Sequence, residues 1–197
     1  MLEFKVTRYE KIHYYENVFE RPYEIIGLIE SLDEQISESE KLSKWNDWMT
    51  SGGQPYQFGM QKRVNERYKP GTNEAIENVL AHLESRITKV SRHYQEEHNI
   101  DIGDLMPLSI SKYFVGKEMG PHCDNYEGTI NGPVISVVGY LNDDYEGGEL
   151  YFKEQDIKIK PSAGSVVIFP SKEPYFHQSL PTKSGVKYMC PGFWYKR

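Results

Sequence analysis

His122 and Asp124 are the side chains in this sequence whose types and spacing most directly suggest chemistry. They stand one residue apart in the stretch GPHCDNY, residues 120 to 126. Alternate side chains of a β-strand point to the same face, so an imidazole and a carboxylate would lie side by side while Cys123 points away. These are two of the three ligands of the triad that holds non-haem Fe(II) and leaves coordination positions open. The same spacing also arises by chance, so the interpretation needs a third ligand.

That third ligand would be a second histidine. His177 is the candidate, because it shares the β-rich half of the chain with His122 and Asp124 and follows a strand-like run, GSVVIFP, and a turn. The other histidines lie on or beside a predicted helix or in the N-terminal segment: His82, His93, His98 and His13. Ordinary packing of these residues is the alternative to metal binding.

Lys187 follows His177 by ten residues, in the strand-like run VKYMCPGFWY. Its neighbours are apolar and aromatic, and a lysine buried in such a strand costs free energy unless it meets an anion. A dicarboxylate co-substrate could supply that anion.

The first hundred residues are predicted to be mainly helical. The clearest helix runs from about Asn73 to His98, where apolar residues recur on one stripe, and a shorter one runs from Pro22 to Leu32, because Pro22 suits a first helical turn. Between them, residues 45 to 72 are rich in Gly, Pro, Gln and aromatic residues, which predicts irregular or short-strand structure.

From residue 105 onward, short runs rich in β-branched and aromatic residues alternate with Gly, Pro, Asn and Asp. Six runs have strand length: LSISKYFV, PVISVVGYLN, GELYFKE, IKIKP, GSVVIFP and VKYMCPGFWYK. We predict an α+β fold, in which a small β-barrel or sandwich surrounds a pocket and the N-terminal helices cover one sheet. We treat residues 1–197 as one domain, with 1–104 as helical support and a lid-like segment and 105–197 as the core barrel.

Composition narrows the functional classes. The formal charge of −6 and the pI near 5.6 argue against nucleic acid as the main partner. No apolar run approaches the ~20 residues of a membrane span, and the N-terminus has no secretion signal, so we expect a cytoplasmic protein without a membrane partner. Two cysteines are too few for a disulfide scaffold, and we expect both to be reduced thiols. The oligomeric state is left open.

Taken together, these motifs resemble the Fe(II)/2-oxoglutarate dioxygenases, and specifically their prolyl 4-hydroxylase branch. The shared pattern is H-x-D, a second histidine some fifty residues later and a lysine ten positions further on, with 52 residues here between Asp124 and His177. KYFVGKEMGPHCD, GYLNDDYEGGELYF and KIKPSAGSVVIF are similar to the family's flanking strands. The likeness covers roughly residues 108 to 197 and implies a double-stranded β-helix, or jelly roll.

The resemblance also implies roles for individual residues. His122, Asp124 and His177 would be the metal ligands and catalytic centre. Lys187 would bind the distal carboxylate of 2-oxoglutarate. Further co-substrate contacts would come from Tyr113, Tyr140 and Ser136. The presence of Asp124 favours hydroxylation, since related halogenases replace this carboxylate with a small residue.

The chain departs from the family pattern at the substrate side. A tryptophan usually stands six residues beyond the basic residue, but here that position is Phe193 and the tryptophan is Trp194. Either a bulge at Pro191 and Gly192 returns Trp194 to the pocket, or Phe193 takes its place. Further candidate substrate contacts lie in the lid-like segment: Trp45, Trp48, Tyr56 and Tyr68.

The implied cofactors are Fe(II), 2-oxoglutarate and O2, with ascorbate as a reductant. The implied reaction is hydroxylation of an unactivated C–H bond, and the expected substrate is a prolyl residue in a peptide or protein, as for a procollagen-proline 4-dioxygenase. Two alternatives are the same chemistry on a free amino acid or another small molecule, and a metal-binding barrel without catalysis. The three ligands and Lys187 speak against the second alternative.

Overall fold

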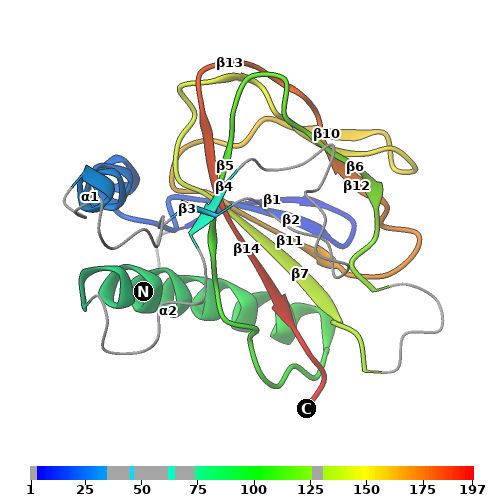
Figure 1. Ribbon diagram of the computed structural model, residues 1–197. Coiled ribbons are helices and arrows are strands. Elements are labelled where there is room, and N and C mark those ends of the chain that lie inside the picture. The colour runs from blue at the N-terminus through cyan, green and yellow to red at the C-terminus, as the bar shows by residue number, and fades with distance from the viewer. Residues whose placement is uncertain (1–3, 35–44, 47–61, 65–73, 126–130) are drawn as a thin grey trace.

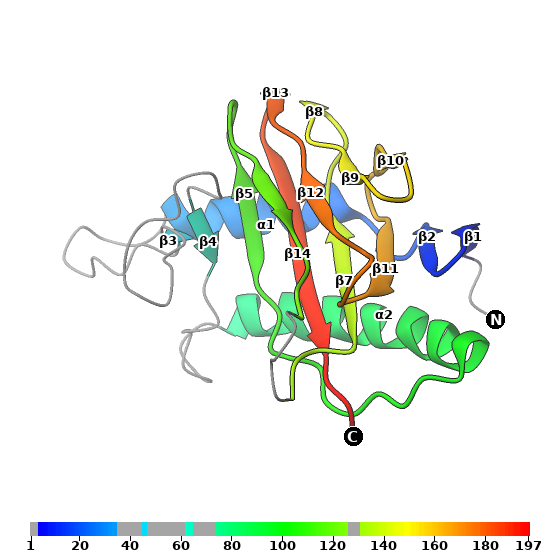
Figure 2. The same ribbon diagram turned by 90° about the vertical axis from the view of Figure 1, so that its right-hand side faces the viewer.

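The computed structural model describes residues 4–34, 45–46, 62–64, 74–125 and 131–197. Within them the chain forms three layers: a pair of helices, a large antiparallel sheet and a smaller sheet (Figure 1, Figure 2). The helices are α1 (Pro22–Glu34) and α2 (Glu74–His98). The strands are β1 (Lys5–Tyr9), β2 (Ile12–Glu16), β3 (Trp45–Asn46), β4 (Lys62–Val64), β5 (Ile110–Tyr113), β6 (Met119–His122), β7 (Ile135–Tyr140), β8 (Glu146–Gly147), β9 (Leu150–Phe152), β10 (Ile157–Ile159), β11 (Val166–Pro170), β12 (His177–Ser179), β13 (Thr182–Ser184) and β14 (Lys187–Trp194).

Both predicted helices are present. α2 follows the predicted bounds to within a residue and ends where Asn99 adopts a φ of 50°, a conformation common just after a helix. Its apolar stripe includes Leu83, Ile87 and Val90, which are fully buried. Figure 2 shows both helices lying across the strands of the large sheet. Neither helix, within the part of the chain that the structure describes, is long and apolar enough to cross a membrane.

The two main sheets confirm the predicted double-stranded β-helix. The large sheet has the order β1-β2-β11-β7-β14-β5-β4-β3, and the smaller one has the order β10-β9-β12-β6. All six predicted strand runs of the second half contain strands, and β3 and β4 fall in the segment predicted to be irregular or short-stranded. Because strands distant in sequence pair within each sheet, residues from β6, β12 and β14 approach one another.

The N-terminal segment contains a β-hairpin that the sequence analysis did not predict within the mainly helical first hundred residues. β1 and β2 form a hairpin, and β2 pairs with β11 so that His13 stands opposite Ile168. The turn contains Glu10 at a φ of 54°. The runs KVTRY and IHYYE are rich in β-branched and aromatic residues, so a strand signal was present in the sequence.

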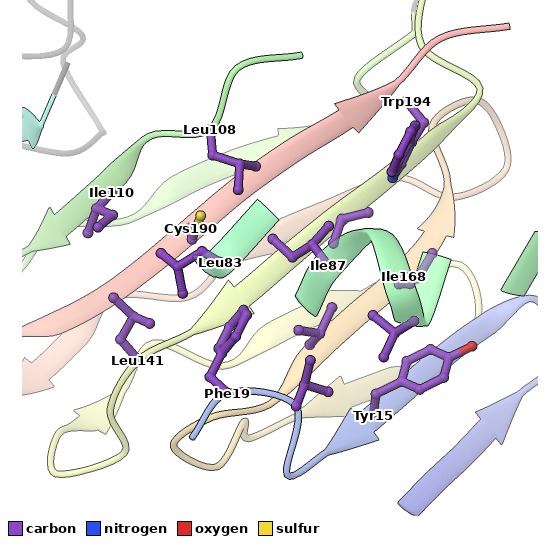
Figure 3. Packing of buried hydrophobic residues seen from close by; sticks show 14 of the residues in the cluster. Tyr15, Phe19, Leu83, Ile87, Leu108, Ile110, Leu141, Ile168, Cys190 and Trp194 are labelled. Carbon is purple, nitrogen blue, oxygen red and sulfur yellow. The ribbon is translucent and has the colours of Figure 1, made fainter. Parts of the chain in front are cut away.

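Two cores lie on opposite faces of the large sheet. One packs against the helices, as Figure 3 shows for residues such as Leu83, Cys190 and Trp194. The other lies between the sheets and contains Met189. Because side chains alternate along β14, its residues are divided strictly between the two faces. This alternation decides which residues of β14 can reach the site.

Candidate metal and co-substrate site

The three predicted metal ligands converge at one point between the sheets. His122 ends β6, His177 begins β12, and the two residues are direct partners across these strands. Asp124 follows β6 by two residues. Its carboxylate oxygens lie 3.4 Å from His122 Nε2 and 3.6 Å from His177 Nε2. Two imidazoles and one carboxylate therefore face a common centre among the described residues.

Backbone carbonyls orient both imidazoles toward this centre. His122 Nδ1 lies 2.8 Å from the carbonyl oxygen of Gly120, and His177 Nδ1 lies 3.2 Å from that of Tyr175. A proton on each Nδ1 can be donated to these carbonyls, which leaves each Nε2 lone pair directed at the centre. Metal-binding histidines are commonly held in this way.

The electrostatics of the cluster differ between the two histidines. Burial lowers the pKa of His177 to about 4, against the opposing charge of Asp124, so this imidazole is neutral at pH 7. Burial alone would also lower the pKa of His122, but hydrogen bonding to Asp124 and its charge outweigh burial and raise it. Burial would raise the pKa of Asp124, but the two histidines and Ser136 lower it. The carboxylate is therefore ionised and ready to bind a cation.

Ser136 was expected beside the co-substrate, but its hydroxyl contacts the metal-site carboxylate instead. Ser136 Oγ donates a hydrogen bond of 2.5 Å to Asp124 Oδ2 and lies 2.8 Å from Ser171 Oγ. Both serines are fully buried. Ser136 therefore fixes the orientation of Asp124. Ser171 was not predicted, because its approach depends on the pairing of β11 with β7.

Lys187 lies at the wall of a cavity of about 400 Å³ that the three candidate ligands also line. The side chain is only 1% exposed. Its ammonium group donates hydrogen bonds of 2.9 Å to the Gly148 carbonyl and 2.5 Å to Ser179 Oγ, both uncharged acceptors. No carboxylate in the described ranges forms an ion pair with it. Burial, and secondarily the charge of Lys160, lowers the pKa of Lys187 to about 7.

The Gly-Gly-Glu turn shapes this end of the cavity. Gly147 and Gly148 have φ values of 71° and 65°, in the left-handed region that favours glycine. A side chain at Gly148 would also come within 3.1 Å of the Lys187 stem. The turn therefore brings a backbone carbonyl to the ammonium group without filling the cavity.

Tyr113 and Tyr140 line the same cavity, each 1% exposed. The Lys187 ammonium lies 4.6 Å from the centre of the Tyr113 ring and 5.9 Å from that of Tyr140. Tyr113 is also the direct partner of Lys187 across β5 and β14. An ammonium group beside two aromatic faces, in a pocket large enough for a small molecule, is a suitable receptor for a carboxylate.

Phe193, and not Trp194, lines the cavity. The pairing of β14 with β7 is continuous from Met189 to Trp194, so the proposed bulge at Pro191 and Gly192 is absent there. Trp194 points to the helix side and donates a hydrogen bond of 2.9 Å to Ser91 Oγ of α2. The prediction that Trp194 could reach the substrate is therefore wrong. Side chains alternate along β14, so Phe193 faces the cavity and the next residue, Trp194, faces the helices.

The lid-like candidates cannot be placed in the same way. Trp48, Tyr56 and Tyr68 lie outside the described residues, and for Trp45 only its position in β3 is described. The cavity instead has apolar lining residues that the sequence did not single out, among them Met106, Met119, Met189 and Leu150. Alternation along the strands could have indicated Met189, which lies two residues from Lys187.

Comparison with known proteins agrees with this geometry. Residues 108–196 match the family model of the 2OG-Fe(II) oxygenase superfamily. A PKHD-type hydroxylase of Prochlorococcus marinus is 36% identical over 90 residues, which are 44% of this chain and 40% of that protein. A PKHD-type hydroxylase of a Synechococcus species is 27% identical over 175 residues, which are 86% of this chain and 74% of that protein. The first relative is thus matched over about two fifths of its length.

A solved structure shares the fold. It is a prolyl hydroxylase from Trichoplax adhaerens in complex with a peptide fragment of the hypoxia inducible factor oxygen degradation domain. The TM-score is 0.74 at 17% identity, with 94% of this chain and 84% of that chain covered.

Fold and site together define a double-stranded β-helix protein with a two-histidine, one-aspartate centre. The match across residues 108–196 shows that this part of the chain is similar to the 2OG-Fe(II) oxygenase superfamily, and the curated relatives that match it are PKHD-type hydroxylases.

Proposed function

We propose that this protein is an Fe(II)- and 2-oxoglutarate-dependent dioxygenase that hydroxylates a prolyl residue in a peptide or protein. The single observation that carries the proposal is Lys187. Among the described residues this buried ammonium group has only neutral hydrogen-bond acceptors, which makes its burial costly. It lies in the cavity that also contains the three candidate metal ligands. A dicarboxylate that reached from the metal to Lys187 would offset that cost.

The candidate ligands fit ferrous iron. His122 and His177 offer Nε2 atoms, and Asp124 offers a carboxylate, a donor set suited to non-haem Fe(II) that leaves positions free for other ligands. Bound iron would supply, with 2-oxoglutarate and O2, an oxidation that releases carbon dioxide from 2-oxoglutarate, places one oxygen atom in the resulting succinate and inserts the other into a substrate C–H bond. We further propose ascorbate as the external reductant that keeps the iron ferrous.

The chain's own residues would hold and shield the reactants. Lys187 would pair with the distal carboxylate of 2-oxoglutarate, while Tyr113 and Tyr140 form the walls of its pocket. Ser136 would hold Asp124 in the orientation that the metal requires. The apolar lining would exclude bulk water from the oxidising centre.

A prolyl substrate is supported by the lining of the cavity on the Phe193 side. Phe193, Pro191 and Met106 offer an aromatic and apolar wall, against which a proline ring packs well. Extended proline-rich peptides also arrive with little conformational entropy to lose. The relatives are named hydroxylases, and the Trichoplax structure is that of a prolyl hydroxylase in complex with a peptide fragment.

The test uses the full chain with Fe(II), 2-oxoglutarate, O2 and ascorbate. Proline-containing peptides, the same peptides with proline replaced by alanine, and free proline are incubated separately. Succinate and the substrate mass are measured together. We expect succinate and a peptide heavier by one oxygen atom for the proline-containing peptides. Faster turnover of free proline would replace the peptide with a small-molecule substrate, and no iron-dependent succinate with any substrate would reject the enzyme.

A further inference from the structure

A second cluster of ligand-type side chains lies on the helix-facing side of the large sheet, away from the cavity. It consists of His13 of β2 and of Glu97 and His98 at the end of α2. His13 Nε2 lies 3.0 Å from His98 Nε2 and 3.8 Å from Glu97 Oε1. All three ligand atoms lie within 4.8 Å of one another. In Figure 2 the β1–β2 hairpin and the C-terminal end of α2 lie on the same side of the molecule.

We propose that His13, Glu97 and His98 form a second divalent-metal site, suited to Zn²⁺. Two atoms bound to one Zn²⁺ ion at ~2.0 to 2.1 Å lie no more than about 4.2 Å apart, so both distances from His13 Nε2 already allow a shared ion. The ligand atoms of Glu97 and His98 lie within 4.8 Å of each other, so a small rotation of the exposed Glu97 carboxylate would bring them within the same limit of about 4.2 Å. Two imidazoles and one carboxylate favour Zn²⁺ over Mg²⁺ or Ca²⁺, which prefer oxygen ligands.

The surroundings of His13 orient it as a metal ligand. Its ring is fully buried, and its Nδ1 lies 3.3 Å from Tyr15 Oη, which lies 3.1 Å from His93 Nδ1. His13 Nδ1 can therefore donate to the tyrosine, and the tyrosine to His93, which leaves His13 Nε2 unprotonated and directed at His98.

The local charge both favours and limits cation binding. The cluster lies at the C-terminal end of a 25-residue helix, where the helix dipole is negative and stabilises cations. Arg8 opposes this, because its guanidinium donates hydrogen bonds of 2.8 Å and 2.9 Å to the two Glu97 oxygens. Each carboxylate oxygen retains a further lone pair, so Arg8 can orient Glu97 and compete with the metal at the same time. We therefore expect removal of Arg8 to strengthen metal binding.

A metal ion here would connect parts of the fold that are distant in sequence. It would fasten the β1–β2 hairpin to the end of α2, and β2 is paired directly with β11 of the large sheet. Its expected effect is therefore on folding stability, and it does not depend on the proposed hydroxylase activity.

The experiment tests the His13, Glu97 and His98 cluster in a protein whose candidate iron site has been disabled. The untagged full chain carrying His122→Ala and His177→Ala is stripped of metal with a chelator and titrated with Zn²⁺ by calorimetry, with metal content measured after desalting. We expect one bound equivalent. At a free Zn²⁺ concentration 100-fold above the dissociation constant, the unfolding midpoint should rise by about 5 to 10 °C.

Variants in the same background identify the ligands. His98→Gln and Glu97→Gln change partly exposed residues and should abolish Zn²⁺ binding or lower its affinity at least tenfold. Arg8→Gln should raise the affinity for Zn²⁺. His82→Gln, on the same helix but outside the cluster, is the matched control and should leave binding unchanged. Absence of a bound equivalent in the background protein, or retention of it in His98→Gln, would show that the two imidazoles share only a hydrogen bond and would overturn the proposal.

Discussion

Lys187→Met is expected to stabilise the metal-free protein and at the same time to remove its affinity for 2-oxoglutarate. Burial is the main reason why the pKa of Lys187 falls from 10.5 to about 7, a difference worth about 5 kcal/mol against the charged form. Methionine fills a similar volume without the charge. It gives up the hydrogen bonds to Gly148 and Ser179, worth about 1 kcal/mol each. The net gain is therefore about 3 kcal/mol, or about 6 to 12 °C in the unfolding midpoint.

The pH dependence of this gain has a definite sign. Between pH 7 and about 10 the unfolded chain keeps the Lys187 proton while the folded protein loses it, so the stability of the wild type rises with pH in this window. The advantage of Lys187→Met should therefore shrink by about 1.4 kcal/mol per pH unit above pH 7. Denaturant unfolding of both proteins at pH 7, 8 and 9 measures it.

Lys112 is the matched control for Lys187. Lys112 is also buried and stands on the neighbouring strand β5, but it already has a carboxylate partner, since its ammonium lies 2.6 Å from Glu30. Lys112→Met should therefore lower stability and leave 2-oxoglutarate binding intact. Calorimetric titration of the metal-loaded variants with 2-oxoglutarate should show an affinity lowered by at least about 30-fold for Lys187→Met and unchanged for Lys112→Met. An unchanged or lowered stability for Lys187→Met, together with retained 2-oxoglutarate binding, would refute the reasoning.

Four further outcomes follow from the site. Asp124→Ala should abolish succinate formation, which a metal-content measurement should trace to lost iron binding. Ser136→Ala should weaken metal binding by about 10- to 100-fold, measured by competition with a chelator, and an unchanged affinity would deny it the positioning role. The apparent dissociation constant of 2-oxoglutarate should rise about tenfold per pH unit above pH 7, because binding must then return a proton to Lys187. Phe193→Ala should raise the KM for a peptide and leave peptide-independent 2-oxoglutarate turnover unchanged; equal losses in both would count against a substrate contact.

The sequence predicted those parts of the site that depend on local periodicity and motif spacing. Strand alternation predicted that His122 and Asp124 lie together, and they do, although β6 ends at His122 and Asp124 follows it outside the strand. The motif order indicated that His177 and Lys187 return to the same place, and the structure brings all four residues into one cavity. These features could be predicted because they depend on residue spacing along a strand or on a recognisable pattern.

The features that were missed depend on pairing between distant strands. Ser136 meets Ser171 because β7 pairs with β11, and it meets Asp124 because the segment after β6 returns to this pair, where Asn125 N donates to the Ser171 carbonyl; no local pattern encodes either approach. The wrong expectation for Trp194 came from allowing a bulge, whereas the β14 register continues through Gly192. The N-terminal hairpin was missed although its runs had strand character, because the helical pattern that follows it dominated the interpretation of that half.

The most direct measurement of the central claim follows the oxygen atoms. The full chain is supplied with Fe(II), 2-oxoglutarate, a proline-containing peptide and O2 enriched in a heavy oxygen isotope, in ordinary water, and the products are analysed by mass spectrometry. The account predicts one heavy oxygen atom in the hydroxylated prolyl residue and one in succinate, with the two products formed in equal amounts and both lost in Lys187→Met at low 2-oxoglutarate concentration. Succinate without a hydroxylated peptide for any peptide offered, or hydroxylation that proceeds without 2-oxoglutarate, would contradict it.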